Sequence, residues 1–326
     1  MNNRRKLLVA LGASTIAAPL ASYAQYKSAK IPRIGIVEFG GPPDSRFVSD
    51  YMSGLKQLGY SEPANLHVER RYAQGNAERF AELLLDLAGE HVDLVFAVGN
   101  DIAQVAKGTV PNLPVVTAGS EDPVMSGLIA SYRRPGGNIT GVTYLSPQLA
   151  AKRLELLKEM LPGLSRVAML WDPTHADTYY SEMESVGRSL GVRLQLVEVR
   201  TAEEIDGALA TVQKGRAEAL FVAPSRFINL QAKRVNQLAV NARLPVMAAY
   251  ANFTEAGGLM SYGAVTADML RRAAAQTDKI LRGDKAGALP YEQAATFELV
   301  VNMKTAKALG IKIPDSIRVR VDKVIE

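Results

Sequence analysis

Polar and aromatic side chains that could contact a small molecule recur directly after short apolar runs of the sequence. These positions are Glu38, Phe39, Gly99, Asn100, Asp101, Ser120, Asp122, Asp172, Thr174, Ser225, Arg226 and Tyr250. The Arg226 guanidinium could hold a carboxylate through two parallel hydrogen bonds. Aromatic rings such as Phe39 and Tyr250 offer a surface for stacking. This mixture suits a small polar or zwitterionic solute, so we predict ligand binding at these positions.

Two of these predictions have simpler alternatives. The segment Gly99-Asn100-Asp101 follows the run DLVFAV and begins a helix, whose first N–H groups attract an anion. Asn100 or Asp101 could instead cap that helix, and the two roles are compatible. Arg226 could instead be a solvated surface arginine.

Recognisable catalytic motifs are missing from the sequence. The chain contains no cysteine and three histidines, which excludes disulfides, thiolate metal sites and cysteine nucleophiles. It has no phosphate-binding loop, no dinucleotide fingerprint and no serine nucleophile elbow. We therefore expect no catalytic residues, no cofactor and no metal. A pair of carboxylates brought together by folding would still allow an isomerase or lyase, which remains the alternative function.

The elements that must position these residues alternate along the chain. Apolar, β-branched runs predict strands at 31–39, 67–72, 93–98, 114–118, 166–171, 192–199, 219–223, 245–248, 258–262 and 297–301. Helical periodicity predicts helices at 45–58, 76–88, 146–160, 177–190, 202–214, 229–242 and 266–281. This alternation indicates an α/β fold with two Rossmann-like lobes, each a parallel sheet covered by helices. Ligands of such sheets lie beyond the carboxyl ends of the strands, so we expect the solute between the lobes.

The first 24 residues have the pattern of a secretory signal peptide. Arg4, Arg5 and Lys6 precede an apolar stretch, and small residues stand before a cleavage site near Ala24. The apolar stretch is shorter than the ~20 residues that cross a bilayer. Cleavage would remove three positive charges and reduce the formal net charge from +5 to +2, which gives no reason to expect nucleic-acid binding. We expect an exported, periplasmic protein, and the pattern fits both general secretion and twin-arginine export.

Several longer segments resemble a known family. They are VDLVFAVGNDIAQVAKGTVPNLPVV, SEDPVMSGLIASYRRPGGNITGV, LMSYGAVTADMLRRAAAQTDKILRG and LPYEQAATFELVVNMKTAKALGIKIP. The chain from about 31 to 324 resembles ABC-transporter substrate-binding proteins of the tryptophan/tyrosine type. The resemblance implies a type I periplasmic-binding-protein fold, with two lobes, three crossovers and a hinge. On this basis we expect one lobe from 31–143 plus 250–286 and the other from 144–249 plus 287–326.

The resemblance also implies ligand positions and a function. Gly99-Asn100 stands where the family usually has Gly-Thr, and Ser225-Arg226 replaces its common Asp-Asn. This replacement favours a small carboxylate-bearing solute, aromatic or amino-acid-like, over tryptophan itself. We expect a monomer that closes on the solute and delivers it to an ABC permease in the inner membrane. A ligand sensor that feeds a membrane receptor is a further alternative.

Overall fold

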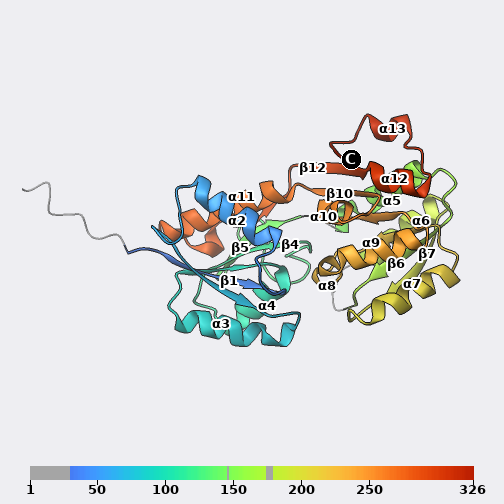
Figure 1. The fold of residues 1–326 in the computed structure, drawn as a ribbon. Helices are drawn as coiled ribbons and strands as arrows, with labels where there is room; N and C mark the ends of the chain where they lie inside the picture. The colour runs from blue at the N-terminus through green and yellow to red at the C-terminus, as the bar shows by residue number, and fades with distance from the viewer. Residues whose placement is uncertain (1–29, 145–146, 174–178) are drawn as a thin grey trace, which may run out of the picture.

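The computed structural model describes residues 30–144, 147–173 and 179–326, and it shows two α/β lobes side by side (Figure 1). The strands are β1 Arg33–Glu38, β2 His67–Tyr72, β3 Leu94–Ala97, β4 Val115–Gly119, β5 Ile139–Thr143, β6 Arg166–Trp171, β7 Arg193–Glu198, β8 Ala219–Val222, β9 Val246–Ala248, β10 Met260–Ala264, β11 Glu292–Gln293, β12 Phe297–Asn302 and β13 Lys323–Ile325. The α-helices are α2 Arg46–Gln57, α3 Phe80–Gly89, α4 Asn100–Thr109, α5 Ala150–Met160, α6 Tyr179–Ser189, α7 Glu204–Lys214, α8 Arg226–Leu230, α9 Ala232–Asn241, α10 Ala251–Glu255, α11 Thr266–Leu281, α12 Met303–Leu309 and α13 Asp315–Arg318. Short 3₁₀ turns are η1 Ala77–Arg79, η2 Pro147–Leu149 and η3 Ala286–Ala288.

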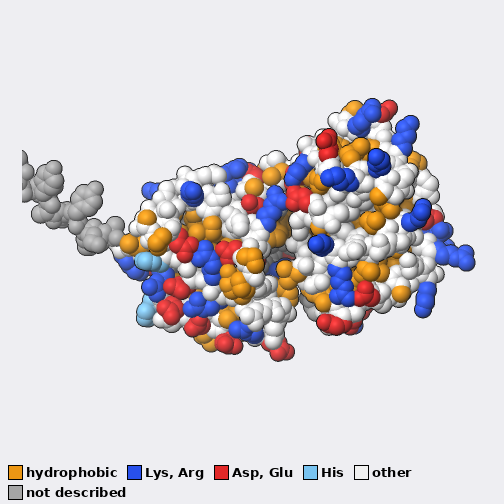
Figure 2. Space-filling view, viewed as in Figure 1, with side chains coloured by type: hydrophobic (Ala, Val, Ile, Leu, Met, Phe, Trp, Pro, Cys, Tyr) orange, Lys and Arg blue, Asp and Glu red, His pale blue; other side chains and the backbone are white. Residues whose placement is uncertain are grey.

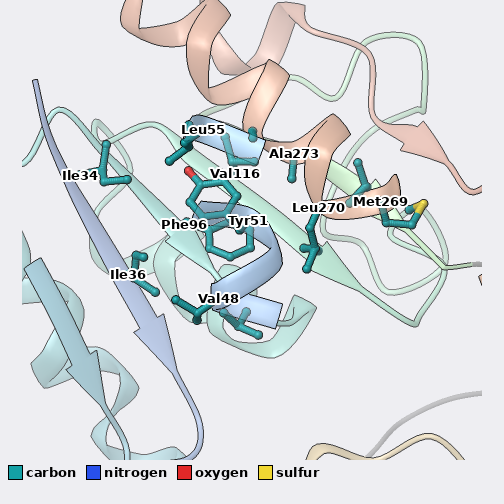
Figure 3. Close-up of a cluster of buried hydrophobic side chains, with 14 of the residues drawn as sticks. Ile34, Ile36, Val48, Tyr51, Leu55, Phe96, Val116, Met269, Leu270 and Ala273 are labelled. Atoms are coloured by element: carbon teal, nitrogen blue, oxygen red, sulfur yellow. The ribbon is translucent and has the colours of Figure 1, made fainter. Parts of the chain in front are cut away.

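The first lobe is built on a parallel sheet with the strand order β11-β5-β4-β3-β1-β2. Successive residues of β1 point to opposite faces, and Ile34 and Val37 are both completely buried. Helices α2 and α11 cover one face, and α3 and α4 cover the other. In the core beneath α2 and α11, the Tyr51 ring stacks on Phe96 with centroids 3.8 Å apart (Figure 3). Burial of both faces explains the nearly continuous apolar strands of this lobe.

The second lobe is built on the sheet β13-β12-β10-β9-β8-β6-β7. Strands β6 to β9 run parallel, and β10 pairs with β12 in the antiparallel direction. Helices α5, α6, α12 and α13 cover one face, and α7 to α10 cover the other. The sheets are therefore mainly parallel, as the alternation of strands and helices predicts.

Three connections join the lobes. The chain leaves the first sheet after β5, returns to that lobe between β10 and α11, and leaves it again between β11 and β12. The connections lie side by side, since Val265 N donates to Thr296 O and Ala294 N donates to Thr143 O, both at 3.0 Å. Such a set of adjacent single-chain connections can act as a hinge.

The expected division of the chain differs from the sheet membership at two of these connections. Residues 250–286 were expected in the first lobe, but α10 and β10 pack in the second lobe, and the return starts at Val265. Residues 287–326 were expected in the second lobe, but β11 pairs with β5 of the first sheet. At each of these two connections the chain passes from one lobe to the other within a few residues, from β10 to α11 and from β11 to β12. Because no long loop separates the lobes there, the composition of the sequence does not change at the boundary.

Most predicted strands and helices are present within a few residues of their predicted limits. The exceptions are β5, β11, β13 and the short helices α10 and α13, which the sequence did not predict. The predicted helix at 229–242 is two helices, α8 and α9, with Gln231 between them. No helix of the described residues is long and apolar enough to cross a membrane. The predicted signal peptide lies outside the described residues.

Candidate functional site

A cavity with an empty volume of about 720 Å³, including the part open to solvent, lies between the two lobes. On the face in view, hydrophobic side chains gather at the junction of the lobes (Figure 2). The lining comes from both lobes and comprises Glu38, Phe39, Gly40, Ser45, Phe47, Val98, Gly99, Asn100, Asp101, Ala118, Gly119, Ser120, Glu121, Tyr144, Ser225, Arg226, Asn229, Leu230 and Tyr250. Nearly all these residues follow the carboxyl ends of β1, β3, β4, β5, β8 and β9. The cavity is therefore at the position where α/β sheets bind ligands.

The start of α4 is a tightly fitted part of this lining. Gly99 precedes the helix with a φ of 124°, in a region that side chains other than glycine rarely adopt. Asn100 is buried, donates to Glu121 O at 3.4 Å and accepts from the Tyr291 hydroxyl at 3.1 Å. A Cβ on Gly119 would overlap the Asn100 amide. The first turn of α4 is thus fixed in place, with its N–H groups at the cavity.

Arg226 connects the two lobes. It begins α8 in the second lobe, and its guanidinium forms a two-pronged ion pair with Asp101 on α4 of the first lobe. The guanidinium also lies over the Phe39 ring, 5.3 Å from its centroid. Burial lowers the pKa of Arg226 to about 10, which leaves it a cation at neutral pH. Arg226 is therefore occupied by a carboxylate of the protein itself and is not a solvated surface arginine.

Glu38 is a buried carboxylate at the end of β1. Only 6% of the residue is exposed, and its Oε2 accepts from Ser45 N at 3.3 Å. Burial raises the pKa of Glu38 above its ordinary value, and the nearby Asp44 adds to this effect. The hydrogen bonds from Ser45 act in the opposite direction but do not cancel the cost of burial. Glu38 is thus a buried carboxyl group whose negative charge the protein compensates only in part.

Three aromatic rings from three separate segments form one wall of the cavity. The centroids of Phe47, Tyr144 and Tyr250 are 5.8–6.1 Å apart, and the rings are inclined to one another by 56–89°. We call these three residues the aromatic cluster. The Tyr144 hydroxyl is buried and has no hydrogen-bond partner among the described residues. Burial raises the pKa of Tyr144 well above its ordinary value, so the hydroxyl remains a donor.

The structure brings together nine of the twelve predicted ligand positions. Those that line the cavity are Glu38, Phe39, Gly99, Asn100, Asp101, Ser120, Ser225, Arg226 and Tyr250. Asp122 does not line it, because its Oδ1 accepts from the N–H groups of Val124 and Met125 in its own loop. Asp172 does not line it either and instead accepts a hydrogen bond of 2.7 Å from the Ser225 hydroxyl. Thr174 lies outside the described residues.

Sequence reasoning missed several lining residues. Phe47 lies on the apolar face of α2 and reads as a core residue, and Asn229 and Leu230 lie inside a predicted helix. Tyr144 directly follows β5, a strand that the sequence did not predict. The rule that strand ends face the ligand would have identified Tyr144 had this strand been recognised. Nothing in the sequence identifies Phe47 as part of a site.

The cavity offers no cluster suited to a metal. In the part of the chain that the structure describes, no three histidine, aspartate or glutamate side chains converge as metal ligands. Among the described lining residues, the ionisable groups other than tyrosine are Glu38, Asp101, Glu121 and Arg226. They can form hydrogen bonds and ionic contacts to an organic solute held against the aromatic cluster.

Comparisons with known proteins agree with this geometry. The chain is 23% identical over 289 residues to a tyrosine-binding protein of Clostridioides difficile, an alignment of 87% of this chain and 83% of the relative. A structure from Streptococcus pneumonia, described as an ABC domain in complex with L-Trp, superposes with a TM-score of 0.83 at 24% identity, over 90% of this chain and 99% of that one. A conserved domain protein from Vibrio cholerae gives a TM-score of 0.83 at 23% identity, over 90% and 100% of the two chains.

The match that decides the family covers nearly all of the described chain. Residues 35–325 match the family described as ABC transporter substrate binding protein. The match includes both lobes, all three connections and every described residue of the cavity. The fold is therefore that of the type I periplasmic binding proteins, and the chain belongs to the family of ABC transporter substrate-binding proteins.

Proposed function

We propose that this protein captures a small amino-acid-like solute in the cavity between the lobes and delivers it, chemically unchanged, to an ABC permease. The observation that carries the proposal is the cavity itself, which takes its lining from the strand ends of both lobes. A solute held there touches both lobes at once and so stabilises the closed arrangement. Differential affinity for the closed form is what allows a ligand to shift a hinge equilibrium.

The chemistry of the walls supports an amino-acid-like solute with an apolar or aromatic side chain. The aromatic cluster offers ring surface, and edge-to-face contacts with such rings add specificity to burial. A carboxylate of the solute would accept hydrogen bonds from the first turn of α4, where the helix dipole favours an anion. The Tyr144 hydroxyl is a second available donor. The tyrosine-binding relative and the tryptophan-bound structure support this class of solute.

The two lobes also contact each other directly. Besides the Arg226–Asp101 pair, Arg46 of α2 donates to Glu255 at the end of α10 at 2.8 Å. Lys323 donates to Glu255 within the second lobe, at 2.7 Å, and so helps to hold that carboxylate in place. The Arg46–Glu255 pair lies outside the cavity and would help to present one fixed surface to a permease.

Thermal-shift measurements with L-tyrosine, L-tryptophan, L-phenylalanine and L-leucine test the proposal, with D-glucose as an unrelated solute. We expect at least one amino acid to raise the melting temperature, because a ligand that binds only the native state stabilises it. The radius of gyration measured by small-angle scattering should be the same with the bound amino acid as without it, or smaller. Chromatography of the recovered solute should find it intact. Absence of binding by all four amino acids, or conversion of a bound one, would contradict the proposal.

The proposed location is the periplasm. The full chain, expressed in a bacterium with an outer membrane, should be released by osmotic shock, and its mass should correspond to a chain that begins at Gln25. Replacement of Arg4 and Arg5 by lysine distinguishes the two export routes, because twin-arginine export depends on that pair. Recovery of the uncleaved chain in the cytoplasmic fraction would contradict this part of the proposal.

A further inference from the structure

The charges that line the cavity are unbalanced. Among the described lining residues, Glu38, Asp101 and Glu121 carry carboxylates, and Arg226 carries the single positive charge. Counted over these four described groups alone, three acids and one base give a formal charge of −2, although Glu121 has a further interaction within the protein. A low-dielectric cavity of this kind attracts cations and opposes anions.

The single cation is already engaged. Both prongs of the Arg226 guanidinium contact the Asp101 carboxylate, and the ring of Phe39 lies under the guanidinium. A solute carboxylate that approached Arg226 would have to displace Asp101 and leave that carboxylate without its partner. Arg226 therefore contributes little to the recognition of an anion, although its type and position in the sequence suggest that role.

Glu38 is the acid that remains in need of a partner. Its carboxylate accepts hydrogen bonds from Ser45, and only 6% of the residue is exposed to solvent. A buried carboxylate without a cation is costly, and an ammonium group placed next to it would remove most of that cost. The raised pKa of Glu38 reports the same imbalance. No lysine and no second arginine lines the described part of the cavity to supply this charge.

The aromatic cluster favours the same kind of ligand group. The three rings contact one another edge to face or at a tilt, with centroids about 6 Å apart, and together they line one wall of the cavity. Ring faces attract an ammonium group, and the attraction is stronger where water is excluded. Phe47, Tyr144 and Tyr250 can thus hold the apolar carbons next to an ammonium group as well as the group itself.

Building on the proposed function, we infer that an ammonium group is the charge that decides whether a solute is held, with Glu38 as its partner. The solute carboxylate contributes less, because Asp101 already occupies Arg226. The cavity therefore selects amines, either amino acids or simple alkyl and arylalkyl amines, over the corresponding acids.

Calorimetry with two matched series of three compounds tests this inference. The first series is L-tyrosine, tyramine, which lacks the carboxylate, and 3-(4-hydroxyphenyl)propanoate, which lacks the amine. The second is L-leucine, 3-methylbutylamine and 4-methylpentanoate. In whichever series binds, we expect the amine to bind within about tenfold of the amino acid, and the acid at least about 30-fold more weakly, as for loss of a buried ionic partner.

A Glu38→Gln variant assigns the effect to one residue. Glutamine keeps the shape and can still accept from Ser45 N, so the loop should stay in place. We expect the amino acid and the amine to lose at least about 30-fold in affinity and the acid to lose nothing. Glu82→Gln is the matched control, since it removes the same charge from an exposed position on α3 outside the cavity, and it should leave all affinities unchanged.

The outcomes separate this inference from the proposed function. If the acid binds as tightly as the amine, or if Glu38→Gln leaves amine affinity unchanged, the inference is wrong while solute capture stands. If the amino acid binds but the amine does not, the inference is also wrong and the carboxylate is the deciding group. If no compound of either series binds and none of the four amino acids of the thermal-shift test binds, the proposed function fails and the inference fails with it.

Discussion

The ion pair between Arg226 and Asp101 should control how readily the two lobes close. Arg226→Gln removes the charge and leaves Asp101 without its partner. Hydrogen bonds to charged groups contribute about 1.5–3 kcal/mol. The side chains of Arg226 and Asp101 are 24% and 36% exposed, so solvent weakens their attraction. We therefore expect the closed form to lose about 2 kcal/mol relative to the open form. Since ~1.4 kcal/mol corresponds to a factor of ten, the ratio of closed to open molecules should fall about 30-fold.

Distances between two spin labels can measure that ratio without any ligand. The chain has no cysteine, so cysteines introduced at the exposed positions Glu78 and Lys214, one on each lobe, would carry the only labels. The long-distance population should grow in Arg226→Gln and in Asp101→Asn. Because the residues act as a pair, the double variant should be no more open than the worse single variant.

Arg234→Gln is the matched control for this experiment. Arg234 also forms an ion pair, with Asp206, but both residues belong to the second lobe. Its removal should therefore leave the distance distribution unchanged. An unchanged distribution in Arg226→Gln, or an equal opening in the control, would refute the assignment of this pair to lobe closure.

Three further perturbations have defined outcomes. Gly99→Ala should favour the open form, because the backbone has a φ of 124° and the added Cβ would overlap the guanidinium of the interlobe pair. The same spin labels check this, and Gly108→Ala on the same helix, where the Cβ meets nothing within 4 Å, should behave like the parent. Ser225→Ala should cost about 2 kcal/mol of folding free energy, because it removes both the hydrogen bond to Asp172 and the cap of α8. The melting temperature should fall by about 3 °C. A change below about one degree would contradict the role of that contact. Glu38 should make the protein less stable as pH rises, because its pKa in the folded state is raised above the ordinary value of 4.5. At pH values between 4.5 and the folded-state pKa, the folded state binds more protons than the unfolded state, so stability falls with rising pH. Urea unfolding from pH 4.5 to 7 should show this slope, and Glu38→Gln should reduce it.

Local patterns in the sequence determine the lobes and the edge at which the ligand should lie. Period-two and period-3.6 alternation reflects burial of one side of each element, so it can be read without the tertiary structure. The direction of parallel strands then places their carboxyl ends at one edge. This reasoning placed Glu38, Asn100 and Ser225 at that edge, because each residue lies at the carboxyl end of a well-defined strand or within three residues of it.

Only the tertiary structure decides which of these side chains contact one another. Arg226 and Asp101 lie 125 residues apart, and nothing in their separation predicts that they pair across two lobes. That contact changes the chemistry of the site, because it removes the cation that the sequence assigned to the ligand. Likewise Phe47 joins Tyr144 and Tyr250 only because α2 begins at the same cleft at which β5 and β9 end. The sequence specifies which charged side chains are available, whereas the fold decides which of them pair and which remain for a ligand, because ion pairs form between groups that are close in space and not between groups that are close along the chain.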